Sequence, residues 1–335
     1  KSYSGYWSGT SMSAAVISGS LARIKESNPK LSNKEVANVL LKSSNNLNNL
    51  NPEYADKLGS GRVNLFSSVN WAQEKWNNLS GYFLLYPQSG ISNFETKDEK
   101  FNTIRLVDSS NKEKNRFFPF SSTYTGSVNI ATGDLNNDGL QEIVVGAGSG
   151  GGPHIRIFDN FGKLISQFFA FNPGFRGGVN IAIGDVDGDG LGEIIAGAGS
   201  GGGPHVRIFD IEGNIKGQFF AYDSNFKGGV NVAVGDIYGD GKSEIITGTG
   251  SGGGPHVRVF SGTGKLISQF FAYENNFTGG IKVEVGNIYG QNTKNDKEII
   301  VSPGNGREPE IKVFDVAGKK LRSIMAFSEK FKNGV

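Results

Sequence analysis

The sequence predicts a multidomain chain in which a short α/β part, residues 1–78, precedes an all-β array of four-stranded units, residues 101–335. Three observations support this division. Apolar residues recur at helical spacing near the N-terminus. After residue 101 the same motifs return every 51 residues. Glycine, with 50 of the 335 residues, gathers after residue 120 and indicates many tight turns.

The N-terminal part is expected to contain two helices and a short strand. Apolar residues between positions 14 and 24 recur at helical spacing, and Ser32 with Glu35 three residues later forms a capping box that opens a second helix. Residues 79–100 are expected to link this part to the array. Within them, residues 82–86 (YFLLY) fit either a strand or a piece of the linker.

The repeat sets the architecture of the rest of the chain. Gly-Asp pairs begin at Gly133, Gly184 and Gly235, and the Pro-His and Phe-Phe pairs keep the same step of 51 residues. A fourth copy is three residues longer. The predicted units are a partial copy, residues 101–126, and four copies, residues 127–177, 178–228, 229–279 and 280–334.

Each copy is expected to contain four short strands, which in the second copy are residues 179–183, 193–197, 205–209 and 215–222. Four antiparallel strands make one blade of a β-propeller. Because one blade leaves part of its faces uncovered, neighbouring copies must stack, and the Phe-Phe pairs are expected to supply that packing. The sequence stops at Val335, where another copy would begin, so we expect an incomplete propeller.

The amino-acid composition excludes or disfavours several kinds of partner and site. Lys and Arg, 34 together, balance 32 Asp and Glu, so net charge favours neither nucleic acid nor an anionic membrane. Cysteine is absent, which excludes disulfides and thiolate metal sites. No apolar run is long enough for a membrane span. The sequence opens on Lys1 without an initiator Met or a signal peptide, so we expect a fragment of a longer protein.

An acidic loop, residues 185–193 (the Asp185 loop), lies between the first two predicted strands of the second copy. Side-chain oxygens at its positions 1, 3, 5 and 9 can converge on one ion, and calcium takes six to eight oxygen ligands. The spacing matches only the first half of an EF-hand loop, because position 12 is Ala196. The alternative is that Asp-Gly pairs merely form hairpin turns.

These loops resemble the calcium loops of FG-GAP and VCBS-like propeller repeats, and the resemblance covers about two thirds of the chain. It implies a Ca²⁺ ion in the Asp185 loop and in its equivalents, the Asp134 loop (residues 134–142) and the Asp236 loop (residues 236–244). The expected ligands, counting backbone carbonyls at Leu140, Leu191 and Lys242, are Asp134, Asn136, Asp138, Leu140, Glu142, Asp185, Asp187, Asp189, Leu191, Glu193, Asp236, Asp240, Lys242 and Glu244. Having four carboxylates, the Asp185 loop is expected to bind most tightly. Tyr238 removes one ligand from the Asp236 loop, and Asn287 with Tyr289 should abolish the site in the fourth copy.

A glycine run before a Pro-His pair, such as residues 199–205, recurs in three copies. A phosphate loop is excluded because no Lys-Ser or Lys-Thr follows and the next element is a strand. The three histidines of the chain occupy equivalent positions in separate blades. We therefore expect them to form hydrogen bonds within their own blades rather than to share a metal.

Ser11 lies in a Gly-Thr-Ser-Met segment that opens into a helix, where a nucleophile would benefit from the helix dipole, although a serine there can also be a plain cap. The segment resembles the nucleophile region of subtilisin-like serine proteases (subtilases), with Ser11 at the nucleophile position. Gly19, Asn28-Pro29 and residues 59–64 match later landmarks of that family. The usual Pro-His after the nucleophile is Ala15-Val16 here. The resemblance implies that residues 1–78 are the C-terminal portion of an α/β subtilisin-like domain.

In this family the catalytic acid and base precede the serine, and the ten residues before Ser11 contain neither Asp nor His. The fragment itself is therefore expected to be inactive. The resemblance implies a secreted or surface-displayed serine endopeptidase that acts on polypeptides, with a propeller that binds calcium for stability or holds a protein or carbohydrate ligand. The alternative is a non-enzymatic surface protein, adhesive or carbohydrate-binding, with a vestigial protease segment.

Overall fold

The computed structural model describes residues 82–85, 103–108, 113–121, 123–288 and 297–330, together with Lys25, Asn33, Lys332 and Gly334. The chain divides into two compact units, and every described strand belongs to the one formed by Tyr82–Asn137 and Gln141–Val335. Lys25 and Asn33 have helical backbone, and Asn33 directly follows the predicted cap Ser32. The rest of the predicted protease segment, Ser11 included, lies outside the described residues.

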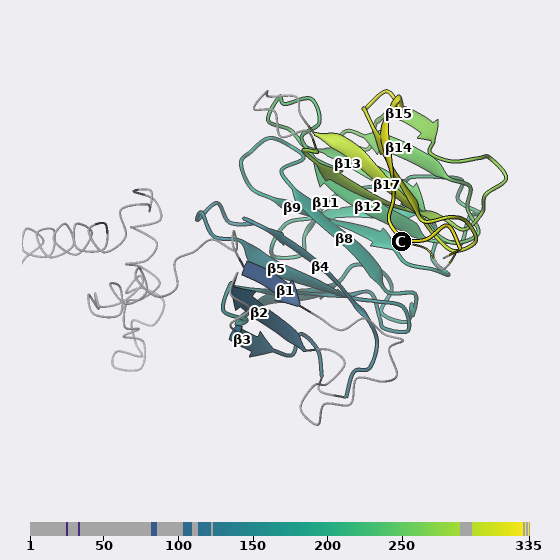
Figure 1. Cartoon of the computed structure of the whole chain (residues 1–335). Coiled ribbons are helices and arrows are strands. Elements are labelled where there is room, and N and C mark those ends of the chain that lie inside the picture. Colours follow the sequence, from purple (N-terminus) through teal and green to yellow (C-terminus); the bar gives the residue numbers. More distant parts are fainter. Residues whose placement is uncertain are drawn as a thin grey trace, which may run out of the picture. The chain divides into compact units, whose positions relative to one another are not determined.

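The described strands form one three-stranded and four four-stranded antiparallel sheets (Figure 1). The three-stranded sheet contains β1 (Tyr82–Leu85), β2 (Ile104–Asp108) and β3 (Glu113–Phe117). Blade 1 contains β4 (Val128–Gly133), β5 (Glu142–Ala147), β6 (His154–Phe158) and β7 (Leu164–Phe169). Blade 2 contains β8 (Val179–Gly184), β9 (Glu193–Ala198), β10 (His205–Phe209) and β11 (Ile215–Phe220). Blade 3 contains β12 (Val230–Gly235), β13 (Glu244–Thr249), β14 (His256–Phe260) and β15 (Leu266–Phe271). Blade 4 contains β16 (Ile281–Gly286), β17 (Glu298–Pro303), β18 (Glu310–Phe314) and β19 (Lys320–Met325).

In each blade the strands pair in chain order, and the first strands of consecutive blades, β4, β8, β12 and β16, contact one another. This is the arrangement of β-propeller blades, and it confirms the predicted all-β array. Residues 82–85 form a strand, which settles the alternative that the sequence left open. Among the described residues, no helix has the length and hydropathy of a membrane span.

The core lies between successive blades. Second strands β5, β9 and β13 are buried along their whole length because blades cover both of their faces. One apolar cluster joins Val144 and Ile155 of blade 1 to Val179 and Ile194 of blade 2. Burial of such side chains stabilises by about 1.5–3 kcal/mol each, so stacking of the copies contributes to the array's stability.

Polar contacts at a spacing of one repeat reinforce the stacking. The Asn180 side chain donates a hydrogen bond to the Val230 carbonyl of the next blade at 2.8 Å. Asn129 and Asn231 make the equivalent bonds at 2.7 Å. These amides form a ladder that satisfies first-strand carbonyls across three blade interfaces.

Only half of each Phe-Phe pair packs as the sequence predicts. Phe219 lies against Phe260 of the next blade, with ring centroids 4.6 Å apart. Its neighbour Phe220 points to the other side of the strand and is 57% exposed. The first phenylalanine of each pair also packs against an outer turn of the next blade, and this turn requires glycine. A Cβ on Gly213, whose φ is 89°, would lie 2.6 Å from Phe168 of blade 1.

Candidate metal centre

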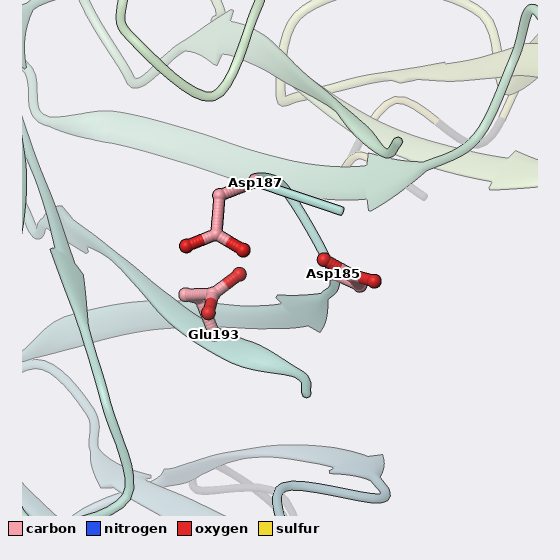
Figure 2. Close-up of side chains that lie close together, drawn as sticks. All are labelled: Asp185, Asp187 and Glu193. Atoms are coloured by element: carbon pink, nitrogen blue, oxygen red, sulfur yellow. The ribbon is translucent and has the colours of Figure 1, made fainter. Parts of the chain in front are cut away.

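The Asp185 loop joins β8 to β9 and gathers three carboxylates. Asp185, Asp187 and Glu193 each offer an oxygen, and these oxygens lie within 4.8 Å of one another. Figure 2 shows the carboxylates of Asp187 and Glu193 facing each other, with Asp185 beside them. No other group of three or more acids or histidines gathers so closely among the residues that the structure describes.

The aspartates fold their own loop. Asp185 accepts the Gly188 N–H through Oδ1 at 2.6 Å and the Gly190 N–H through Oδ2 at 2.8 Å. Asp189 Oδ1 accepts the Leu191 N–H at 2.8 Å. Gly188 and Gly190 have φ values of 83° and 85°, which side chains with a Cβ rarely adopt. The local sequence therefore favours this turn whether or not an ion is bound.

Glu193 anchors the loop to the second strand. Its side chain is buried, and Oε2 accepts the Val186 N–H at 2.9 Å. Glu142, Glu244 and Glu298 accept the equivalent N–H groups in the other three blades at 2.9–3.0 Å. In the fourth copy, where Asn287 replaces the first aspartate, Glu298 still accepts this bond, so the glutamate has a structural role.

Lys216 of β11 places its ammonium among these carboxylates. Its Nζ lies 2.6 Å from Asp187 Oδ2, 2.8 Å from Glu193 Oε1 and 3.5 Å from Asp189 Oδ2. Hydrogen bonds to Asp187 and Glu193 raise the pKa of Lys216, and the bond from Lys216 lowers the pKa of Asp187. The spacing of the acidic residues does not predict a role for Lys216. The repeat does distinguish it, because blades 1 and 3 carry Ile165 and Ile267 at the equivalent position.

A second lysine approaches from blade 3. Lys242 Cε lies 2.9 Å from the point where a Cβ on Gly188 would sit, so its side chain runs along the Asp185 loop. The Lys242 charge also contributes to the lowered pKa of Asp187. Lys242 was expected to offer only its carbonyl to the Asp236 loop, yet its side chain faces the neighbouring blade.

The Asp236 loop has similar backbone hydrogen bonds, and among the described residues no lysine forms a salt bridge with its carboxylates. Asp236 accepts the N–H groups of Asp240 and Gly241 at 3.1 and 3.0 Å. No salt bridge joins Asp236, Asp240 or Glu244 to a basic residue in the described part of the chain. Burial, and then the charges of Asp240 and Asp236, raise the pKa of Glu244. The described carboxylates of this loop do not gather as closely as those of the Asp185 loop.

In the Asp134 loop, the Asn136 side chain donates to Glu142 Oε1 at 3.2 Å. Asp138 Oδ1 accepts the Leu140 N–H at 2.8 Å. In the fourth copy, Asn287 is exposed and Tyr289 lies outside the described residues.

The loops of adjacent blades are linked in series. The Asp134 carbonyl accepts the Gly192 N–H at 3.1 Å, and the Asp185 carbonyl accepts the Ser243 N–H at 2.7 Å. A cavity of about 740 Å³ lies between the Asp185 and Asp236 loops, and its lining includes Asp187, Glu193, Lys216, Tyr238, Asp240 and Glu244. The acidic loops thus share one edge of the array and are hydrogen-bonded to one another.

The histidines bond within their own blades, as the sequence predicts. His205 Nε2 lies 3.1 Å from Gln218 Oε1, and its ring lies 4.8 Å from that of Phe220. Burial, and then the charge of Arg207, lower the pKa of His205. Burial likewise lowers the pKa of His154 and His256.

Comparison with known proteins assigns two segments. Residues 1–64 match the subtilase family, and residues 134–196 match the FG-GAP-like repeat. No curated protein matches the chain.

Solved structures match the array at low identity. A protein of unknown function from Bacteroides caccae is 10% identical with a TM-score of 0.46, and the match covers 73% of each chain. The Dos1 propeller is 14% identical with a TM-score of 0.43, and 69% of this chain covers 55% of it. Virginiamycin B lyase from Staphylococcus aureus is 12% identical with a TM-score of 0.45, and 68% of this chain covers 64% of it. The chain therefore joins a subtilase-family segment, residues 1–64, to an array of propeller blades that contains FG-GAP-like repeats.

Proposed function

We propose that this chain is part of a secreted or surface-displayed subtilisin-like serine endopeptidase whose propeller blades bind calcium. The observation that carries the calcium proposal is that oxygens of Asp185, Asp187 and Glu193 lie within 4.8 Å of one another beside a glycine turn. Carboxylate and carbonyl oxygens are the ligands that calcium prefers, and the loop supplies both kinds.

The residues present fit such an ion. In the Asp236 loop, Glu244 is buried beside the charges of Asp236 and Asp240, and its pKa is raised. Burial is the largest cause of that rise, and the two neighbouring carboxylates add to it. A bound divalent cation would remove the repulsion and restrain the loop, which in turn is hydrogen-bonded to its neighbour. The role proposed for calcium is therefore to stabilise the edge of the array.

The peptidase proposal rests on the match of residues 1–64 to the subtilase family. Ser11 stands at the family's nucleophile position and would attack the peptide carbonyl in the whole protein. Asp and His residues from elsewhere in that protein would orient and activate it. The histidines of this chain do not serve that purpose, because all three support blades.

Partner binding is the second candidate function, and exposed aromatic residues favour it. Phe169, Phe220 and Phe271 lie at equivalent outer positions of three blades and are 50–57% exposed. Each lies against a histidine of the same blade, with ring centroids 4.7–4.8 Å apart. A protein or carbohydrate ligand would find three similar apolar surfaces there.

Two measurements test the main proposal separately. Calorimetric titration with CaCl₂ should give heat that disappears when Asp134, Asp185 and Asp236 are all changed to Asn. The whole protein should hydrolyse casein, and its Ser11→Ala variant should not. Absence of calcium binding contradicts the metal proposal, and casein hydrolysis by the Ser11→Ala variant contradicts the assignment of the nucleophile.

A further inference from the structure

The ammonium of Lys216, on β11, lies among the carboxylates of the Asp185 loop. We propose that the ammonium of Lys216 takes the place of a bound metal there, so that this loop keeps its form without calcium and binds calcium more weakly than the Asp236 loop. The inference rests on the proposed calcium function. It reverses the ranking that the number of carboxylates alone predicts.

The first argument is the position of the ammonium. Lys216 Nζ lies 2.6 Å from Asp187 and 2.8 Å from Glu193, which are two of the three converging carboxylates. These are ordinary lengths for charge-assisted hydrogen bonds. A calcium ion that uses the same two carboxylates would have to displace the ammonium, and breaking these bonds subtracts from its affinity.

The second argument comes from the equivalent positions of the same chain. Blades 1 and 3 have Ile165 and Ile267 in place of Lys216, and both isoleucines are exposed. An isoleucine can neither neutralise nor bond a carboxylate. Likewise, Leu191 of blade 2 occupies the loop position of Lys242, whose side chain runs along the Asp185 loop. Both lysine side chains therefore lie beside the loop with the most carboxylates.

The third argument is the contrast between the two neighbouring loops. The Asp185 loop has four carboxylates and two lysine side chains beside it. The Asp236 loop has three carboxylates and no salt bridge to a basic residue in the described ranges. The carboxylates of the Asp236 loop therefore offer a cation less competition, although they are fewer.

The test isolates each loop by calorimetry. In the full chain, Asp134→Asn and Asp236→Asn together remove the other two calcium sites and leave only the Asp185 loop. Lys216→Met, added to this background, removes the ammonium and keeps an unbranched side chain. We expect Lys216→Met to tighten calcium binding by about tenfold or more, because a competing unit charge at contact distance is lost. Lys265→Met, which removes an exposed lysine from an outer turn of blade 3, is the matched control and should change nothing.

Thermal unfolding in a chelator gives an independent result. Lys216→Met should melt below the parent without calcium and regain that loss when calcium is added, since its carboxylates then depend on the metal. The reciprocal variant, Ile267→Lys, gives the Asp236 loop a lysine at the same blade position. It should weaken calcium binding there by a similar factor, and this test holds even if Lys216→Met does not fold in the chelator.

The outcomes separate the two proposals. If no variant binds calcium, the proposed metal function fails. If calcium binds but Lys216→Met and its parent have equal affinity, or if Ile267→Lys leaves the Asp236 loop unchanged, the role assigned to Lys216 is wrong while the metal function stands.

Discussion

The asparagine ladder between blades gives a prediction whose size follows from its contacts. Asn180→Ala removes the bond to the Val230 carbonyl at 2.8 Å and a second, to Asn231 Oδ1, at 3.1 Å. The alanine is too short to replace them, and the carbonyl of the buried Val230 loses its partner. Such a loss costs about 1–3 kcal/mol. For a unit of this size, each kcal/mol lowers Tm by about 2–4 °C.

The assay is thermal unfolding followed by circular dichroism at fixed calcium concentration. The matched control is Asn225→Ala, because Asn225 is exposed in the loop after β11 and no hydrogen bond of its side chain is found among the described residues. We expect Asn180→Ala to melt several degrees lower than Asn225→Ala. Equal melting temperatures for the two variants would refute a stabilising role for the ladder.

Three further predictions concern the blades. Gly213→Ala should destabilise more than Gly201→Ala, because both have positive φ but only the first meets Phe168; equal urea midpoints would contradict this. Tyr222→Phe should lower the free energy of unfolding by about 1–3 kcal/mol. The Tyr222 hydroxyl accepts a hydrogen bond from Thr247 and donates one to the His256 carbonyl of the next blade. An unchanged urea midpoint would count against that role. Folding lowers the pKa values of the three histidines, so the unfolded chain binds more protons than the folded one. The free energy of unfolding, measured in urea, should therefore be full above about pH 6.5 and decline below it. Replacing all three histidines with Asn should flatten that decline.

The sequence predicts the blades well because the repeat constrains them many times over. A segment that returns every 51 residues with the same Gly-Asp, Pro-His and Phe-Phe pairs must fold in the same way each time, so strands such as β9 and β10 could be placed from one copy and checked in the others. The histidine contacts follow for the same reason.

Departures from the repeat are what sequence reasoning missed. Lys216 is 23 residues from Glu193, and Lys242 belongs to another blade, so neither falls within the loop that the spacing argument considered. Both become visible only when the fold brings β11 and blade 3 beside the Asp185 loop. Phe220 was misjudged because two successive strand residues point to opposite faces, so only one member of a Phe-Phe pair can face the next blade.

Calcium dependence of thermal stability tests the central claim most directly. The chain should melt at a higher temperature in excess CaCl₂ than in a chelator, since a ligand at 100 times its Kd adds about 2.7 kcal/mol per site. Asp236→Asn should remove much of that increase. Glu298→Gln, in the loop where Asn287 replaces the first aspartate, should leave it unchanged. An identical melting temperature with and without calcium, or a full increase in the Asp236→Asn variant, would contradict the account.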